Sequence, residues 1–208
     1  MSDLIFYTNP MSRGRIVRWM LEEIGCEYQT RIIEHGSAMK APDFLTINPM
    51  GKVPALSHKG KVVTETPAIL CYLADAFPEA KLAPSAAERQ AYYRWLFFAA
   101  GPLEAALTDR TLGLEVPEDK RGMVGYGSYE LAVDVLTAAV AGGQYIAGKK
   151  FSAADIYVGS HIAWGTQFGT LPKRPEFEQY RNLVTDREAY RRVNELDNAL
   201  MPPQATSA

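Results

Sequence analysis

The sequence predicts a small mixed α/β domain followed by an all-helical domain. Short apolar runs alternate with helix signals from the N-terminus to about Phe77, as in a sheet packed against helices. Strand signals nearly vanish after Pro78–Pro84, a stretch with two prolines and little periodicity, which is typical of a linker. We therefore expect domains at residues 1–80 and 87–208, joined by a linker at residues 81–86.

The first domain is predicted to run strand, helix, strand, helix, hairpin, helix, an order that fits a mixed four-stranded sheet. The expected elements are Leu4–Tyr7, Arg13–Ile24, Tyr28–Ile33, an irregular stretch with Pro42–Leu45, the strands Ala55–His58 and Lys61–Thr64, and a helix from Thr66. Gly25 ends the first helix, and Gly60 supplies the positive φ that the hairpin turn needs.

The second domain is predicted to contain only helices. They are expected at Ala87–Leu112, Pro117–Ala141, Ser152–Phe168, Pro175–Thr185 and Asp186–Leu196. Ser152 and Asp155 have the spacing of a capping box, which satisfies the first amides of a helix, so we assign them a structural role. We expect residues 202–208 to form a loose tail.

Composition excludes several classes of function. The net charge is -2 and the pI is about 6.0, so no cationic surface for nucleic acid or anionic membranes is expected. No apolar run approaches the length of a membrane span and no leader pattern opens the chain, so we expect a cytoplasmic protein. Cys26 and Cys71 lack metal-type spacing, and His35, His58 and His161 are widely scattered, so no metal site is expected.

Val53–Pro54 is the first candidate functional feature. An X-Pro bond can be cis, and a cis bond in a compact domain usually shapes a turn beside something that it must accommodate. The plainer alternative is that Pro54 only opens the strand that follows, at a position where no amide donor is needed.

Glu65-Thr66-Pro67 forms the second feature, because Thr66 is a suitable N-cap and Pro67 a suitable first helical residue. A helix start stabilises a carboxylate through its unpaired amides and its dipole. Glu65 adds an acceptor for an amine, so the pair could hold an amino-acid headgroup. An ordinary cap beside a solvated Glu65 is the alternative.

Ser12 is the third feature, because it lies between a strand end and a helix start. One alternative is that it serves only as the N-cap. No histidine lies near it in the sequence, so a hydrolytic triad is unsupported. A hydroxyl at a helix N-terminus can instead donate a hydrogen bond to a thiolate and lower the pKa of that thiol.

The chain resembles the cytosolic glutathione transferases over nearly its whole length. The resemblance rests on four motifs in this order: Tyr7-Thr8-Asn9-Pro10-Met11-Ser12-Arg13, Asn48-Pro49-Met50-Gly51-Lys52-Val53-Pro54-Ala55-Leu56, Glu65-Thr66-Pro67-Ala68-Ile69 and Phe151-Ser152-Ala153-Ala154-Asp155. It implies a thioredoxin-like N-terminal domain that binds glutathione, an all-helical C-terminal domain that helps to bind an electrophile, and a homodimer. It implies no metal.

The resemblance also implies residue roles. Ser12 would stabilise the glutathione thiolate, which then attacks an electrophilic, apolar substrate in a detoxification reaction. The glutathione site would consist of Lys40, Lys52, Val53, Pro54, Glu65 and Thr66. Pro54 would be cis, Val53 would pair its backbone with the cysteinyl part, Glu65 and Thr66 would take the γ-glutamyl end, and the lysines would lie near the glycyl carboxylate.

Departures from the family pattern leave alternatives open. Tyr7 stands two residues further from Arg13-Gly14-Arg15 than in the tyrosine-type classes, so Tyr7 or Asn9 could share or replace the role of Ser12. The first loop has no cysteine, which disfavours the thiol-transfer and isomerase classes. Alternative functions are a glutathione-dependent peroxidase or dehalogenase, or a non-catalytic glutathione-binding or regulatory protein.

Overall fold

The structure is a computed structural model that describes residues 3–201. Its contacts divide into two compact units, one formed by the residues up to Ala80 with those from Arg187, and the other by Lys81–Asp186. No helix of the described part of the chain is long and apolar enough to cross a membrane. The predicted tail at residues 202–208 lies outside the described residues. The predicted domain boundaries stay a prediction.

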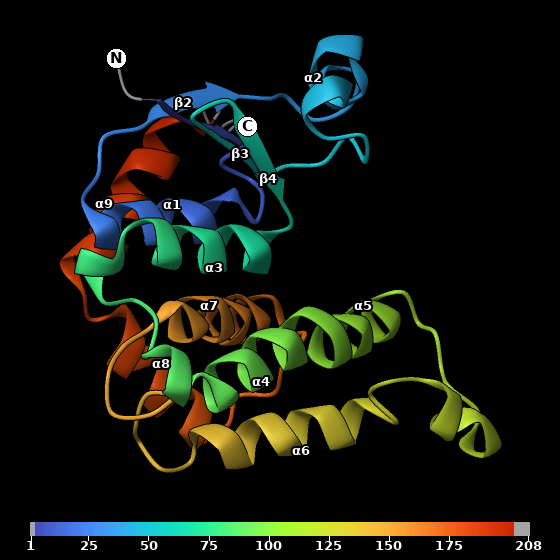
Figure 1. Cartoon of the computed structure of the whole chain (residues 1–208). Coiled ribbons are helices and arrows are strands. Elements are labelled where there is room, and N and C mark those ends of the chain that lie inside the picture. The colour runs from blue at the N-terminus through green and yellow to red at the C-terminus, as the bar shows by residue number, and fades with distance from the viewer. Residues whose placement is uncertain (1–2, 202–208) are drawn as a thin grey trace, which may run out of the picture. The chain divides into compact units, whose positions relative to one another are not determined.

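A four-stranded mixed sheet, in the order β2-β1-β3-β4, forms the centre of the first unit within residues 3–201 (Figure 1). β1 (Leu4–Thr8) pairs in parallel with β2 (Gln29–Ile32) and antiparallel with β3 (Ala55–His58). β3 in turn pairs antiparallel with β4 (Lys61–Thr64). The mixed sheet that the sequence predicted is therefore confirmed, and both hairpin strands have the predicted bounds.

Helices lie on both sides of this sheet (Figure 1). α1 (Gly14–Ile24) and α3 (Thr66–Ala76) contact each other and cover one face. α2 (Pro42–Ile47) lies on the other side, after a short 3₁₀ helix at Ala38–Lys40. The order strand, helix, strand, helix, hairpin, helix is therefore confirmed.

Alternate side chains of β1 face these two helical layers, as the period of a strand requires. Phe6 is buried toward α1, where the guanidinium of Arg18 lies 5.3 Å from its ring centroid. Its neighbour Tyr7 points to the opposite face, where its ring centroid lies 6.1 Å from that of Phe44 in α2.

The turn between β3 and β4 has two residues with positive φ. Lys59 has φ 51° and Gly60 has φ 75°, the left-handed conformations that a two-residue hairpin turn of type I′ requires at both positions. The sequence predicted this role for Gly60, which adopts the conformation without steric cost. Lys59 adopts the left-handed conformation as well, although it is not a glycine.

α9 (Glu188–Ala199) packs along α1, which the sequence did not predict (Figure 1). Charged side chains line the contact: Arg18 meets Asp197 at 2.9 Å, with both side chains buried, and Arg192 meets Glu22 at 2.6 Å. Burial raises the pKa of Asp197, and the nearby Arg18 opposes this rise. Removing either partner of the buried pair would leave an uncompensated charge.

The second unit is helical. It contains α4 (Gln90–Phe98), α5 (Glu104–Thr111), α6 (Tyr129–Val140), α7 (Ala153–Phe168) and α8 (Pro175–Thr185). The single helix predicted at Ala87–Leu112 is interrupted, because a π turn at Ala99–Leu103 joins α4 to α5. Pro102 lies inside this turn, and because it has no amide hydrogen, the regular ladder of helical hydrogen bonds is broken there.

The helix predicted at Pro117–Ala141 is wrong in its first part. A short 3₁₀ helix occupies Glu118–Met123, and the α-helix begins only at Tyr129. Ser128 is its N-cap, with a hydroxyl that accepts from the backbone N–H of Leu131 at 3.1 Å. The capping side chain gives the helix a favourable start at this later position.

The predicted capping box at the start of α7 is confirmed. The buried Asp155 accepts four hydrogen bonds, from the backbone and hydroxyl of Ser152 at 2.9 Å and from Ile146 N–H and Tyr180 O–H at 2.8 Å. Burial raises the pKa of Asp155, and these donors oppose the rise. One carboxylate thus joins α7 to α8 and to the segment before α7.

Replacing Asp155 with alanine should destabilise the second unit strongly. Asp155→Ala removes the shared acceptor and leaves buried donors unsatisfied, so we expect a loss of about 3–5 kcal/mol, measured by chemical denaturation. Ser128→Ala is the matched control, because it removes one exposed cap bond worth about 1 kcal/mol. Equal losses in the two variants would contradict the bridging role of Asp155.

Candidate active site

Three segments meet at one edge of the sheet. Ala55, the first residue of β3, pairs with Tyr7 of β1 and with Thr64 of β4. Neighbouring strands lie about 4.8 Å apart. The loop that follows β1, the Val53–Pro54 bond before β3 and the start of α3 after β4 therefore lie side by side.

The Val53–Pro54 bond is cis, as the sequence led us to expect. Pro54 is buried and Val53 is half-buried. The turn before them is held by the buried Asn48, whose amide donates to Lys52 O at 2.8 Å and whose Oδ1 accepts from Met50 N–H at 3.1 Å. One side chain therefore fixes the backbone that leads to the cis bond.

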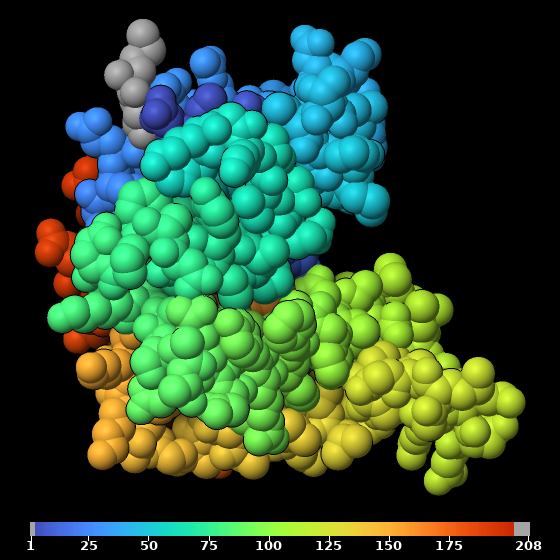
Figure 2. All heavy atoms as spheres, in the orientation of Figure 1, coloured from blue at the N-terminus to red at the C-terminus, as the bar shows by residue number. Residues whose placement is uncertain are grey.

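Both lysines of the predicted site are exposed. Lys52 lies on this turn, and Lys40 lies beside it at the end of the 3₁₀ helix Ala38–Lys40. The Nζ of Lys40 donates to Met50 O at 2.9 Å. Gly51 has φ 58°, and a Cβ there would lie 2.5 Å from Met39 O, so the turn packs closely against the 3₁₀ helix that carries Lys40. Figure 2 shows the segment around α2, in light blue, projecting beside the hairpin.

The start of α3 differs from the prediction in one respect: Glu65 occupies the N-cap position, and Thr66 is the first helical residue. Glu65 is exposed with φ 67°, a conformation that costs a non-glycine residue about 1–3 kcal/mol and often marks a ligand site. No side chain of the described residues caps this end. Because Pro67 has no N–H, the amides of the buried Thr66 and of Ala68 are the ones that can meet an acceptor.

The first loop is braced by its own polar groups. Ser12 is half-buried; its hydroxyl donates to Asn9 O at 2.7 Å and accepts from Gly14 N–H at 3.0 Å. Asn9 is buried, and its side chain donates to Ile33 O at 3.1 Å and accepts from Met11 N–H at 2.9 Å. Ser12 is not the N-cap of α1, because Arg13 holds that position.

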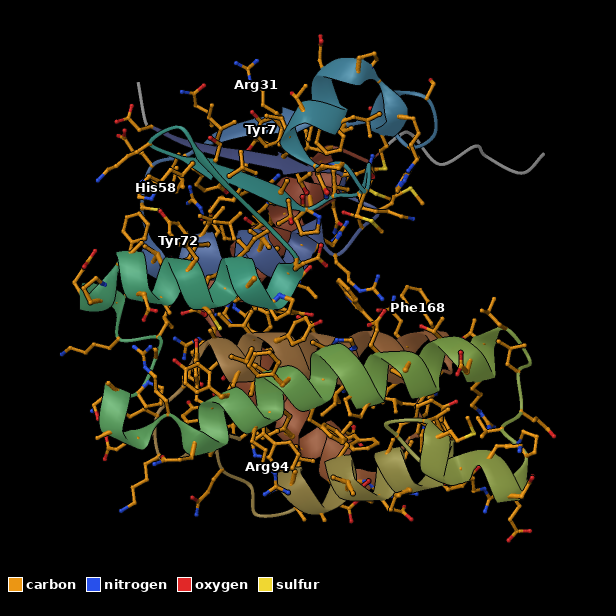
Figure 3. The ribbon with its side chains drawn as sticks, turned by 45° about the vertical axis from the view of Figure 1, so that its right-hand side comes forward. Tyr7, Arg31, His58, Tyr72, Arg94 and Phe168 are labelled. Carbon is orange, nitrogen blue, oxygen red and sulfur yellow. The ribbon has the colours of Figure 1, made fainter. Side chains whose placement is uncertain are left out.

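These contacts separate the three candidate donors of the loop. The Tyr7 ring packs on Phe44, on the face of the sheet opposite to α1 (Figure 3). The Asn9 side chain already bonds to Ile33 O and to Met11 N–H. Ser12 carries the hydroxyl next to the start of α1. A rotation of this hydroxyl can turn its proton from Asn9 O toward another acceptor.

Sequence reasoning missed two residues that support this loop. Gly14 packs against the end of β1, where a Cβ would lie 1.9 Å from Thr8 Oγ1. Arg15 donates from Nε to Pro10 O at 2.6 Å. The Arg13-Gly14-Arg15 pattern was visible in the sequence, but neither contact can be read from it because both depend on the path of the loop.

The sequence is similar to known proteins. Residues 2–75 match the model of the glutathione S-transferase N-terminal domain. The whole chain is 28% identical, over an alignment 225 positions long, to glutathione S-transferase 3 of Zea mays, with 100% of each protein covered. The first 75 residues therefore carry the sequence of a glutathione S-transferase N-terminal domain, and the chain as a whole is similar to glutathione S-transferases.

Solved structures of glutathione transferases share the fold. The enzyme of Methylococcus capsulatus strain Bath is 25% identical with a TM-score of 0.78, over 94% of this chain and 99% of that one. A sphingomonad glutathione S-transferase complexed with glutathione is 26% identical with a TM-score of 0.74, over 93% and 98%. The sheet and its helices are the thioredoxin-like domain of this transferase family, and a helical domain follows.

Substituting Gly14 should displace the start of α1. Because the Cβ of Gly14→Ala would overlap Thr8 Oγ1, we expect a loss of about 1–3 kcal/mol, measured by urea denaturation. The double variant Thr8→Ala/Gly14→Ala removes the obstructing oxygen and should regain most of the loss. A single variant as stable as the unmodified protein would show that the loop accommodates the methyl group freely.

Proposed function

We propose that this protein is a glutathione transferase that binds glutathione at the described edge of the sheet and activates its thiol as a thiolate for attack on an electrophilic, apolar substrate. The observation that supports this best is the uncapped start of α3, with Glu65 in a positive-φ conformation, beside the cis bond and the Ser12 loop. The sphingomonad relative, which was solved with glutathione, supports the same ligand.

The start of α3 suits the γ-glutamyl end of glutathione. The α-carboxylate accepts from the amide and hydroxyl of Thr66, where the helix dipole favours negative charge. The α-ammonium pairs with the carboxylate of Glu65. The unusual backbone of Glu65 directs this residue toward the ligand, which gives its strain a function.

The middle of the tripeptide lies along Val53. The backbone of Val53, just before β3, pairs with the cysteinyl part by main-chain hydrogen bonds. The glycyl carboxylate then lies toward the turn that carries Lys40 and Lys52, both exposed cations. In this orientation the thiol faces the first loop.

Ser12 acts on that thiol. Its single proton is donated to Asn9 O in the structure, at 2.7 Å. A thiolate is a stronger acceptor than a neutral carbonyl, so the proton turns to the sulfur when glutathione binds. This bond and the N-terminus of α1 together lower the thiol pKa, and each unit of lowering corresponds to about 1.4 kcal/mol.

The remaining features of the proposal follow from the family. The protein acts as a homodimer in the cytoplasm, in detoxification, and uses glutathione as a co-substrate without a metal. Within residues 3–201, no three potential ligands among His, Cys, Asp and Glu come together in a way that could hold a metal ion. Size-exclusion chromatography with light scattering tests the dimer.

Removing the Ser12 hydroxyl should raise the pKa of the bound thiol. For Ser12→Ala we expect kcat/KM with a chromogenic aryl halide to fall about 10- to 100-fold at neutral pH and to recover partly at higher pH, because the thiolate loses a donor. Glutathione binding, measured by calorimetry, should change little.

Two further variants control this experiment. Ser12→Thr keeps the hydroxyl and should keep most of the activity. Tyr7→Phe should have no effect, because the Tyr7 ring packs toward α2. Full activity in Ser12→Ala together with a loss in Tyr7→Phe would reject Ser12 as the thiolate donor.

Neutralising Glu65 should weaken glutathione binding without affecting the chemical step. Glu65→Gln keeps the size of the side chain but loses the charged partner of the ammonium group, so we expect Kd to rise about tenfold by calorimetry. N-acetylglutathione, which has no ammonium group, is the matched ligand. It should bind both proteins equally, and a tenfold difference with it would exclude the proposed contact.

A further inference from the structure

Arg15 connects two distant parts of the first unit. Its Nε donates to Pro10 O at 2.6 Å, in the loop that carries Ser12. Its Nη2 donates to Asn198 Oδ1 at 2.9 Å, near the end of α9. One planar guanidinium therefore holds the loop on one side and α9 on the other.

The end of α9 is a firm anchor for this connection. Asp197, which is fully buried, holds Arg18 of α1 at 2.9 Å, one helical turn beyond Arg15. Asn198 is the next residue and is exposed. The buried ion pair between Asp197 and Arg18 therefore fixes the position of Asn198 relative to α1, with or without a ligand.

The other contact of Arg15 determines where the first loop lies. Pro10 precedes Ser12 by two residues, and Ser12 in turn bonds to Asn9 and Gly14. A shift of the Pro10 carbonyl would carry the Ser12 hydroxyl with it. A displacement of about 1 Å in a reacting group can cost up to about 100-fold in rate.

We propose that Arg15 and Asn198 are positioning residues through which α9 sets the place of the Ser12 hydroxyl. The inference rests on the proposed function for its effect on catalysis, but not for its effect on the loop. Neither residue touches the reacting atoms in this scheme, because both act through the Pro10 carbonyl.

A different role for Arg15 can be separated from positioning. Its positive charge alone could favour a nearby thiolate, and Arg15→Lys would then keep full activity. Lysine cannot reproduce two bonds from one planar group, so positioning predicts that Arg15→Lys loses activity. Asn198→Ala sharpens the distinction, because it leaves the charge of Arg15 in place and removes only its anchor.

The test compares Asn198→Ala with Arg192→Ala. Arg192 also joins α9 to α1, through Glu22 at 2.6 Å, and neither residue of this pair belongs to the first loop. Asn198→Asp, which keeps the acceptor oxygen, is the rescue variant. Each protein is measured for Tm, for the pH dependence of glutathione conjugation to an aryl halide, and for amide hydrogen exchange over residues 8–16.

We expect Asn198→Ala to lower kcat about three- to tenfold, to shift the pH midpoint upward, and to leave KM for glutathione nearly unchanged. Exchange in residues 8–16 should become about threefold faster or more, and Asn198→Asp should restore both values. Arg192→Ala should match the unmodified protein in kcat and loop exchange, even if its Tm falls equally.

Unchanged loop exchange in Asn198→Ala, equal changes in Arg192→Ala, or full activity in Arg15→Lys would overturn the inference. If the unmodified protein neither binds glutathione nor conjugates it, the proposed function fails by itself. The exchange measurement then decides the positioning role alone, because it requires no ligand.

Discussion

The pairing of β3 with both of its neighbours is the constraint on which the candidate site depends. Ala55 stands opposite Tyr7 and Thr64, so the cis bond lies between the first loop and the start of α3. A slip of one residue would turn the buried Leu56, which pairs with Phe6, to the opposite face of the sheet, where Ala55 now lies, so the packing of Leu56 holds the register. The hydrophobic pattern of the hairpin thus determines the site geometry, although no residue of that pattern belongs to the site.

The sequence predicted the features that local physics controls. The bounds of the hairpin strands and of α8 are as expected, because a turn residue such as Gly60 and a first-turn proline such as Pro175 act over a few residues. The Ser152–Asp155 capping box is equally local. For the site, the sequence could predict the cis bond and the residue types, but not how Ser12 uses its hydroxyl, because that depends on where the loop carbonyls lie.

Features that depend on distant contacts were beyond sequence reasoning. Arg18 and Asp197 are 179 residues apart, and nothing in either neighbourhood indicates the other. The burial of Arg18 against two aromatic rings is likewise not indicated by its neighbours in the sequence.

Two predicted helix starts were wrong for local reasons. The first part of the helix predicted from Pro117 was wrong because Ser128 caps the helix at a later start. Thr66 was placed at the N-cap, one residue too late, since Glu65 adopts a backbone conformation that no propensity favours.

Under the proposed function, the hydrogen bonds of the first loop require that the loop be rigid. Turning the Ser12 proton to a thiolate leaves Asn9 O without that donor, at a cost of about 1 kcal/mol, which the charged bond to sulfur must exceed. The exchange is favourable only if the oxygen stays in place while its proton changes partner. A mobile loop would lose this advantage in ordering entropy. The close contact of Gly14 with Thr8 and the bond from Arg15 to Pro10 both restrain the loop before any ligand arrives.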